Sequence, residues 1–250
     1  MDTAKTSVES KVVGLGILGY GKMGQMIAQL AEKRGCHVRL AMDIDVNKGG
    51  SGITRKNFRE IEVCIDFTTP EAAVTNIERV AKIGCNLVVG TTGWQSELPR
   101  VRKIIEEAGV GMVYAANFSI GMQLFYRLTR LAAEFFSQVP QYDPYLLEQH
   151  HKFKKDAPSG TALDLKKMVN EIYPGHEISV PAVRAGYFPG THELGFDSEA
   201  DTIELRHTAR SRQGFAEGAL YAARWVIGKK GLFEFSEILP GKENYHVGSS

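Results

Sequence analysis

The chain has 250 residues, of which 43% are hydrophobic and 24% charged, and its formal net charge is +1. This composition is typical of a soluble globular protein, and so small a charge gives no general attraction to nucleic acid or to an anionic membrane. No apolar run approaches the ~18 residues of a membrane-spanning helix. Met1–Ser10 is polar and lacks the apolar core of a signal peptide. We therefore expect a cytoplasmic protein with no nucleic-acid and no membrane partner.

The three cysteines agree with that location. Cys36, Cys64 and Cys85 are odd in number, far apart in the sequence and form no CxxC pair. They are predicted to be buried thiols in a reducing compartment.

A glycine-rich turn lies near the start of the chain, where Gly14–Gly19 and Gly19–Gly24 both fit GxGxxG. The first frame would place two glycines inside the following helix, at a cost of ~1 kcal/mol each. The second frame gives a strand over Val12–Leu18, a turn, and an amphipathic helix that stops at Gly35. The predicted phosphate-binding turn is therefore Gly19, Tyr20, Gly21, Lys22, Met23 and Gly24.

An acidic residue follows at the distance that a dinucleotide fold requires. The second predicted strand, Val38–Met42, ends on Asp43, 19 residues after Gly24. A carboxylate in this position binds a ribose hydroxyl of a nicotinamide cofactor. The alternative is a glycine-rich turn in some other α/β protein.

Strands and helices continue to alternate, with strands expected at 63–67, 87–89 and 111–115. Repeated units of this kind predict an α/β fold with a parallel, doubly wound, Rossmann-type sheet. Ligands lie outside the carboxyl ends of such strands. Gly90–Gly93 and Ala116–Ser119 are therefore candidate contact loops, although Gly90–Gly93 can also be a simple turn.

The pattern changes after residue 118. Helices are expected at 120–137 and 163–172, strands at 143–148, 178–182 and 202–209, a turn at 186–190, and a last helix at 215–227. Few helices with several strands indicate a second, α+β domain. We assign residues 1–118 and 213–250 to the dinucleotide-binding domain, and residues 119–212 to a substrate-binding and oligomerisation domain.

The second domain contains the most chemically loaded stretch, Glu148–Ala162, with two adjacent histidines, three lysines and a Pro-Ser-Gly-Thr sequence. Pro158 forces its predecessor out of helical geometry, and Ser159 or Thr161 can cap the helix that follows. A helix N-terminus presents free N–H groups to an anion. The stretch predicts proton donors beside a carboxylate or phosphate site. The alternative is a basic surface loop before an ordinary capped helix.

Acid–base chemistry fits these residues better than metal chemistry does. Neighbouring residues of a strand point to opposite faces, so His150 and His151 cannot both bind one metal ion, and His192 lacks metal-ligand spacing. We predict no metal. Lys154 can act as a proton donor or attract a substrate carboxylate. No GxSxG turn supports a hydrolase, and His207 is interpreted as a partly buried sheet residue.

From Val12 to about Leu239 the chain resembles the 4-hydroxy-tetrahydrodipicolinate reductase (dihydrodipicolinate reductase) family of lysine and diaminopimelate biosynthesis. The most specific motif is Glu148-x-His150-His151-x-x-Lys154-x-Asp156-Ala157-Pro158-Ser159-Gly160-Thr161-Ala162. Supporting motifs occur in the same order: Gly19–Gly24, Asp66-Phe67-Thr68, Gly90–Gly93, Ala116–Ser119, Val183-Arg184-x-Gly186, Gly190-Thr191-His192 and Ser211-Arg212.

The resemblance implies roles for individual residues. His150 would be a proton donor and acceptor and Lys154 a second proton donor. The dicarboxylate substrate would be bound by His151, Gly160 and Thr161, to which the predicted helix start adds Ser159. NADH or NADPH would be bound by the glycine turn, Asp43, Gly90, Thr91, Thr92, Ala115, Ala116, Asn117 and Phe118. The family is typically a homotetramer built through the substrate-domain sheet.

The chain departs from the family after the ribose-binding acid, where many members have an arginine. Here Asp43 is followed by Ile44 and Asp45. A 2′-phosphate would meet negative charge at this point, so we expect NADH to be used at least as well as NADPH. A basic residue from a neighbouring segment could offset the repulsion; the candidates are Lys22, Lys48, Arg55 and Lys56. Two other functions stay open: another dehydrogenase of amino-acid metabolism, and a non-catalytic dinucleotide sensor.

Overall fold

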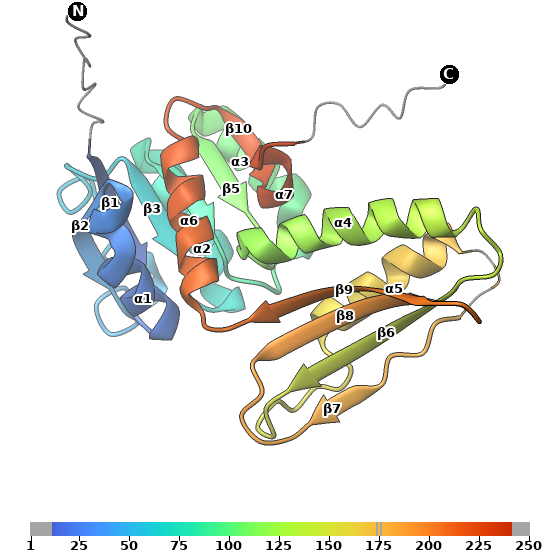
Figure 1. Cartoon of the computed structure of the whole chain (residues 1–250). Helices are drawn as coiled ribbons and strands as arrows, with labels where there is room; N and C mark the ends of the chain where they lie inside the picture. Colours follow the sequence, from blue (N-terminus) through green and yellow to red (C-terminus); the bar gives the residue numbers. More distant parts are fainter. Residues whose placement is uncertain (1–11, 174, 176, 242–250) are drawn as a thin grey trace, which may run out of the picture. The chain divides into compact units, whose positions relative to one another are not determined.

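The computed structural model describes residues 12–173, 175 and 177–241. The chain divides into a first unit, Met1–Phe118 with Phe215–Ser250, and a second unit, Ser119–Gly214 (Figure 1). Within the described residues, no helix has the length and apolar character needed to cross a membrane. The expectation about a signal peptide rests on Met1–Ser10, which lies outside these residues.

The first unit is built on a six-stranded sheet in the order β10-β5-β4-β3-β1-β2, in which all neighbouring strands are parallel. The strands are β1 Val13–Leu18, β2 Cys36–Met42, β3 Val63–Asp66, β4 Asn86–Val89, β5 Gly111–Tyr114 and β10 Gly231–Glu234. This topology confirms the predicted Rossmann-type sheet. The edge strand β10 and the short helix α7 (Phe235–Ile238) were not predicted.

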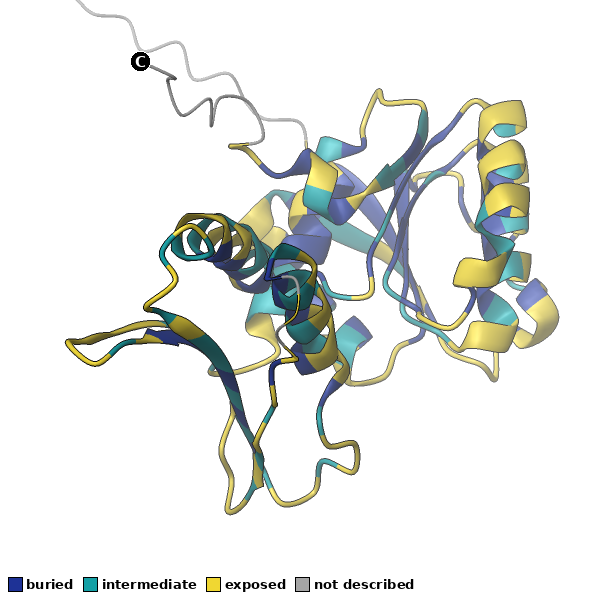
Figure 2. Cartoon of the chain, turned by 90° about the vertical axis from the view of Figure 1, so that its right-hand side faces the viewer, coloured by how far each residue is buried: buried dark blue, intermediate teal, exposed yellow. Residues whose placement is uncertain are grey.

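Helices connect these strands and bury the sheet between them (Figure 2). They are α1 Lys22–Ala31, α2 Pro70–Ile83, α3 Leu98–Ala108 and α6 Gln213–Trp225, with short 3-10 helices at Glu32–Arg34, Lys48–Gly50 and Gln95–Glu97. Gly84 and Gly109 end α2 and α3 in the left-handed conformation that glycine adopts most easily. A Cβ at Gly218 would lie 1.8 Å from the Phe118 carbonyl oxygen. The glycine therefore lets α6 pack directly on the chain that follows β5.

All three cysteines are buried free thiols in this unit. Burial raises the pKa of Cys36 to about 11 and that of Cys85 to about 12, and it also raises the pKa of Cys64. The predicted burial of the three cysteines is confirmed, and their raised pKa values keep the thiols protonated at neutral pH.

The second unit contains a four-stranded sheet in the order β7-β6-β8-β9. Strand β6 pairs in parallel with β7 and antiparallel with β8, which pairs antiparallel with β9. The strands are β6 Asp143–His150, β7 Ala182–Arg184, β8 Gly190–Asp197 and β9 Thr202–Ala209; the helices are α4 Ile120–Phe136 and α5 Gly160–Ile172. Leu146, Leu165, Val169 and Leu194 form part of its apolar core.

Several predicted boundaries in the second unit were wrong. Ile178–Ala182 is not a strand; β7 begins where that prediction ended. Strand β8 was missed, although six of its eight residues are buried. Its sequence contains two glycines and a buried His-Glu pair, so it lacks the alternation that identifies a half-exposed strand. Strand β6 also continues to His150, two residues beyond its predicted end.

Candidate active site

The glycine turn after β1 has the geometry of a phosphate-binding turn. Gly19 has φ +84°, and a Cβ there would lie 2.4 Å from the Phe67 carbonyl oxygen. A Cβ on Gly24 would lie 2.3 Å from the Gly19 carbonyl oxygen, so this glycine lets α1 pack against the turn. At Gly21 a Cβ would meet no described atom within 4 Å. The first glycine thus makes the turn, the third allows close packing, and the second leaves its backbone open to a pyrophosphate.

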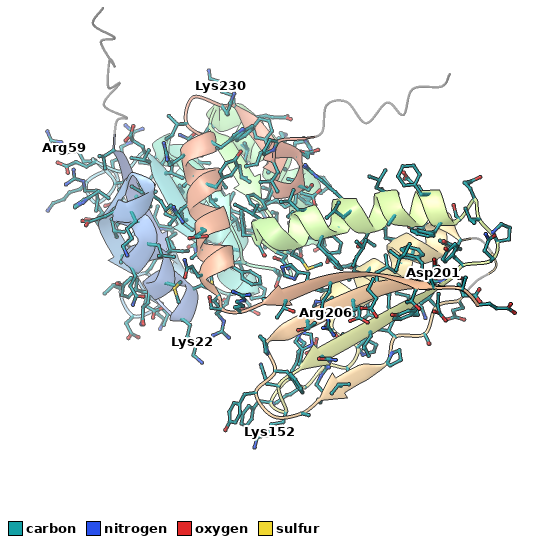
Figure 3. All side chains as sticks on the ribbon, in the orientation of Figure 1. Lys22, Arg59, Lys152, Asp201, Arg206 and Lys230 are labelled. Atoms are coloured by element: carbon teal, nitrogen blue, oxygen red, sulfur yellow. The ribbon has the colours of Figure 1, made fainter. Side chains whose placement is uncertain are left out.

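A cavity of about 410 Å³ adjoins this turn. Gly19, Gly21, Asp43 and Lys48 are among its lining residues, together with Ile44. The Asp43 carboxylate accepts a hydrogen bond of 2.9 Å from the Ile44 N–H. Lys22, the first residue of α1, is exposed and projects from the first unit (Figure 3). The cavity has the lining expected for a bound ribose beside an acidic residue.

The remaining predicted cofactor residues follow β4 and β5. Thr91 is buried, Thr92 is exposed, and Ala116 is exposed between the buried residues Ala115 and Phe118, with Asn117 half-buried. Because β1, β4 and β5 are parallel members of one sheet, their following loops meet at the same edge as the glycine turn.

Asp66, the last residue of β3, organises that edge and was not singled out by its chemistry in the sequence. Its carboxylate is 1% exposed and accepts hydrogen bonds from the Thr68 N–H at 2.8 Å, the Asn76 side chain at 2.9 Å and the Thr91 hydroxyl at 3.0 Å. Burial raises its pKa, and hydrogen bonds from these neutral groups offset the effect only in part. Asn76 in turn accepts from Asn47 at 3.3 Å, so the network extends to two residues that line the cavity.

The second unit has its own buried carboxylate, Glu148 of β6, which is fully buried. Its Oε1 accepts hydrogen bonds from the Ser159 N–H at 3.0 Å and from Arg184 Nη2 at 2.5 Å, and its Oε2 accepts from the Ser159 hydroxyl. Its Oε2 also lies 3.4 Å from His150 Nδ1 and 3.6 Å from His192 Nε2. We call Glu148, His150, Ser159, Arg184 and His192 the Glu148 centre.

Burial, hydrogen bonds and neighbouring charges together set the protonation states in the Glu148 centre. Burial alone would raise the pKa of Glu148, but hydrogen bonds from Ser159 and Arg184 and the charge of Arg184 outweigh it and lower that pKa. Burial lowers the pKa of His150, against the opposing effect of Glu148. Burial also lowers the pKa of His192 to about 4. At neutral pH the centre holds a carboxylate, a guanidinium and two neutral imidazoles.

Lys154 lies in the loop that follows β6. Its ammonium group forms an ion pair with Asp156, with distances of 2.8 and 3.0 Å to the two carboxylate oxygens. Its backbone N–H donates to the His151 carbonyl oxygen at 3.1 Å. The Lys154 charge is close enough to His150 to contribute to the lowering of that pKa. The predicted catalytic pair is therefore electrostatically coupled.

His151 belongs to a different group of side chains. Its ring centre lies 6.0 Å from that of Phe153, which is also 6.0 Å from the Tyr187 ring. Lys152 lies over Phe153 and Tyr187, 5.2 and 5.7 Å from their ring centres, at the labelled tip in Figure 3. His151 is half-buried. His151 directly follows β6, and its charge contributes to the lowering of the His150 pKa.

Helix α5 begins beside the Glu148 centre. Ser159 is its N-cap, and the Ser159 hydroxyl oxygen accepts from the Ala162 N–H at 3.2 Å. Of the two caps considered from the sequence, the structure uses Ser159. A Cβ on Gly160 would meet no described atom within 4 Å. The first turn, which includes Gly160 and Thr161, has N–H groups without helical acceptors and therefore offers them to a carboxylate.

Glu148, His150 and His192 also present possible metal ligands within 4.8 Å of one another. Sequence reasoning predicted no metal because His150 and His151 point to opposite faces and His192 lacks metal-ligand spacing; it did not foresee that β8 brings His192 to His150. Both Glu148 oxygens already accept hydrogen bonds, one of them from a guanidinium. A metal ion would have to share the carboxylate with that cation, so the contacts favour a hydrogen-bonded centre.

Comparison with known proteins places this geometry in a family. The family model described as "Dihydrodipicolinate reductase, N-terminus" matches residues 13–118, and "Dihydrodipicolinate reductase, C-terminus" matches residues 121–239. The 4-hydroxy-tetrahydrodipicolinate reductase of Christiangramia forsetii is 35% identical over 238 residues, which cover 91% of this chain and 98% of that protein. The enzyme of the same name from Methanoregula boonei is 36% identical, with coverage of 92% and 98%.

Solved structures agree. The dipicolinate-bound dihydrodipicolinate reductase from Paenisporosarcina sp. TG-14 has a TM-score of 0.73 at 25% identity, covering 91% of this chain and all of that one. An amine dehydrogenase from Mycobacterium smegmatis, with a TM-score of 0.61 at 10% identity and coverage of 92% and 96%, shares the fold alone. With both halves matched by family models and relatives above 30% identity along nearly the whole chain, the protein belongs to the dihydrodipicolinate reductase family.

Proposed function

We propose that this enzyme reduces 4-hydroxy-tetrahydrodipicolinate to tetrahydrodipicolinate with NADH or NADPH, in lysine and diaminopimelate biosynthesis. The observation that carries the proposal is the Glu148 centre. The centre contains a buried neutral histidine, and the stretch 148–161 adds the Lys154–Asp156 ion pair and an open helix N-terminus, in a chain that belongs to this reductase family.

The catalytic groups are His150 and Lys154. The reaction adds a hydride and a proton and releases water, and the nicotinamide supplies the hydride when it is bound. Lys154, an ammonium in its ion pair with Asp156, holds the proton to be donated. His150 is neutral because burial lowers its pKa, so it accepts a proton or hydrogen bond first and donates only afterwards.

The substrate carboxylates bind at the start of α5. Gly160 and Thr161 would offer backbone N–H groups, Ser159 caps the helix, and the family resemblance adds His151, which directly follows β6. The dipicolinate bound to the similar Paenisporosarcina enzyme supports a planar dicarboxylate as the ligand class. Pyridine-2,6-dicarboxylate should therefore compete with the substrate, and inhibition that is not competitive would contradict this site.

The first unit is proposed to be the dinucleotide-binding domain and the second the substrate-binding and oligomerisation domain. The open backbone at Gly21 and the cavity beside Asp43 fit a dinucleotide. The loops at Gly90–Thr92 and Ala115–Phe118 would hold its remaining parts. Family resemblance further suggests a homotetramer formed through the β7-β6-β8-β9 sheet, in the cytoplasm.

One assay separates the proposal from its two alternatives. NADH oxidation is followed by absorbance while the enzyme is supplied with freshly synthesised 4-hydroxy-tetrahydrodipicolinate, and again with a panel of keto acids and ammonium; amino acids are tested with NAD⁺ in place of NADH. The proposed reductase oxidises NADH only with 4-hydroxy-tetrahydrodipicolinate. Turnover with the panel alone would indicate another dehydrogenase, and cofactor binding without any turnover would indicate a sensor.

A further inference from the structure

The Glu148 carboxylate has no contact with the solvent, and it connects several elements of the second unit. It lies on β6 and touches the N-cap of α5, Arg184 of β7 and His192 of β8. Strand pairing places Glu148 directly opposite His192, on the face that carries Leu146 and Leu194 into the core under α5. A carboxylate buried on this face is costly unless each oxygen is paired.

We propose that Glu148 is a positioning residue for the dicarboxylate: through Ser159 and Arg184 it fixes the N-terminus of α5 and the loop before it in the conformation that binds substrate. The inference deepens the proposed function and rests on it. Glu148 itself is covered by these partners, so it acts through them and does not contact the substrate.

The contacts in the Glu148 centre are consistent with one arrangement of hydrogen-bond donors and acceptors. The Ser159 hydroxyl has one hydrogen, which it donates to Glu148 Oε2, while its oxygen accepts from the Ala162 N–H. His192 Nε2 lies 3.2 Å from the same oxygen and must therefore be the donor there, which puts the hydrogen of the neutral ring on Nε2. One carboxylate thus orients the serine that caps α5, and the serine fixes the tautomer of His192.

Arg184 extends the same arrangement to the loop before α5. Its Nη2 contacts Glu148 Oε1 at 2.5 Å and the Asp156 carbonyl oxygen at 2.6 Å. Asp156 is also the ion-pair partner of Lys154. Glu148 therefore holds both ends of the segment 156–159: one through Arg184, the other through Ser159. This places the catalytic lysine and the carboxylate-binding helix start on a common support.

Glu148→Gln tests the role with the smallest possible change. The amide oxygen still accepts from the Ser159 N–H, but the charge is lost and the amide nitrogen cannot accept from the Ser159 hydroxyl. The KM for substrate and the Kd for pyridine-2,6-dicarboxylate should rise about tenfold to a hundredfold, as expected for lost hydrogen bonds to a buried charge. The Kd for NADH, measured by fluorescence titration, should stay within about twofold.

Glu193, which follows His192 on β8, provides a matched control. Glu193 is 6% exposed and pairs with Arg206 at 2.9 Å, on the opposite face of the same sheet. Glu193→Gln therefore removes a buried, paired carboxylate without touching the start of α5. It should leave dicarboxylate binding within about twofold of wild type. An equal loss in both variants would overturn the proposal, because it would show a general effect on the sheet.

A second readout separates positioning from simple destabilisation. The groups that face His150 are Glu148, which raises its pKa, and His151, Lys154, Arg184 and the His192 ring, 5.2 Å away. Removing the Glu148 charge should lower the pKa of His150 in an NMR titration of the histidine Cε1–H signals. An unchanged His150 pKa together with unchanged dicarboxylate affinity overturns the proposal.

Should Glu148→Gln fail to fold, Arg184→Gln tests the other contact of the same carboxylate. It should weaken pyridine-2,6-dicarboxylate binding at least tenfold while NADH still binds; unaffected binding overturns the proposal. A wild-type enzyme that neither turns over nor binds pyridine-2,6-dicarboxylate would contradict the proposed function instead. A wild type that does both, beside a folded Glu148→Gln variant with wild-type affinity, overturns only the role of Glu148.

Discussion

Each unit of the molecule buries a carboxylate beside the loops proposed to bind its ligand, and these two carboxylates are stabilised in different ways. Asp66 in the first unit accepts hydrogen bonds from hydroxyl, amide and backbone donors, all of them neutral. Glu148 in the second unit has a similar set but adds a guanidinium, Arg184. Burial therefore prevails at Asp66 and raises its pKa, whereas hydrogen bonds and charge prevail at Glu148 and lower its pKa.

The difference fits the ligand that we propose for each unit. A dinucleotide brings a negative pyrophosphate, and a network of neutral donors shapes loops without adding a strong field. A dicarboxylate is smaller and is attracted by fixed positive charge and oriented N–H groups. The comparison predicts that changes around Asp66 alter cofactor binding and that changes around Glu148 alter substrate binding and turnover.

The largest expected effect is a loss of turnover without a loss of NADH affinity. His150→Ala and Lys154→Ala should each lower kcat by ~10²–10⁴-fold, because each removes a group that we propose transfers a proton. The Kd for NADH should be unchanged in both, because neither residue belongs to the first unit. Steady-state kinetics and NADH titration measure the two quantities. Wild-type turnover in either variant would remove that residue from the mechanism.

A change at Asp66 should have the opposite pattern: weaker NADH binding with unchanged dicarboxylate binding. Asp66→Asn turns one acceptor of its network into a donor that faces the Asn76 amide, Thr68 or Thr91. NADH affinity should fall about tenfold, as for other buried hydrogen bonds of this kind. Affinity for pyridine-2,6-dicarboxylate should not change. A loss confined to the dicarboxylate would invert the comparison and refute it.

The preference between NADH and NADPH tests the effect of the Asp43 charge in the first unit. The enzyme should use NADH at least as well as NADPH, since a 2′-phosphate ~4 Å from Asp43 costs on the order of 1–4 kcal/mol. Lys48 lines the cavity with Asp43, unlike the other basic candidates Lys22, Arg55 and Lys56. A preference for NADPH above tenfold in kcat/KM would contradict the prediction, and Lys48→Ala should then remove that preference.

Two glycines of the phosphate turn separate binding from folding. Gly21→Ala adds a methyl group in open space, so the melting temperature should hardly change while NADH affinity falls. Gly24→Ala forces a contact with the Gly19 carbonyl and should destabilise the fold by about 1–3 kcal/mol, the usual cost of overpacking. Thermal unfolding and NADH titration on both variants test the pair. Equal NADH affinity in Gly21→Ala and wild type would argue against a pyrophosphate at this turn.

The smallest expected effect is on stability in acid. The pKa of Glu148 in the folded state is below its ordinary value of 4.5. Its charged form therefore stabilises the fold above pH 4.5, and this stabilisation is lost as the pH falls through the folded-state pKa. Asp66 has a folded pKa above its ordinary 3.8, so its folded form takes up a proton first and gains stability as the pH falls.

Urea unfolding between about pH 3 and pH 7 measures both signs. Glu148→Gln should make the loss of stability in acid shallower, and Asp66→Asn should make it steeper. Each unit of pKa difference between the folded and unfolded states corresponds to about 1.4 kcal/mol. Parallel curves for the two variants would show that the carboxylates do not differ in the way proposed.

The parallel sheet was predictable, apart from β10, because most of its strands are short apolar runs between glycine or proline signals, and periodicity detects such runs. Strand β8 was not predictable in the same way. Its His192 and Glu193 are polar residues that become buried only through partners on β6 and β9. Tertiary contacts, rather than local preference, determine that segment.

The site shows the same division. The motif around His150, Lys154 and Ser159 was visible because those residues are close in sequence. Arg184 and His192 reach Glu148 from 36 and 44 positions away, through strand pairing alone. Asp66 carried one available signal, an acid that ends a wholly buried strand.

The three thiols of the first unit give the molecule a built-in chemical reporter. Cys36, Cys64 and Cys85 are buried, protonated at neutral pH, and the only cysteines in the chain. Iodoacetamide should therefore alkylate the native enzyme slowly, at a rate set by how often the first unit opens. Labelling with and without NADH would measure how strongly the cofactor closes that unit, independently of any event in the cysteine-free residues 119–214.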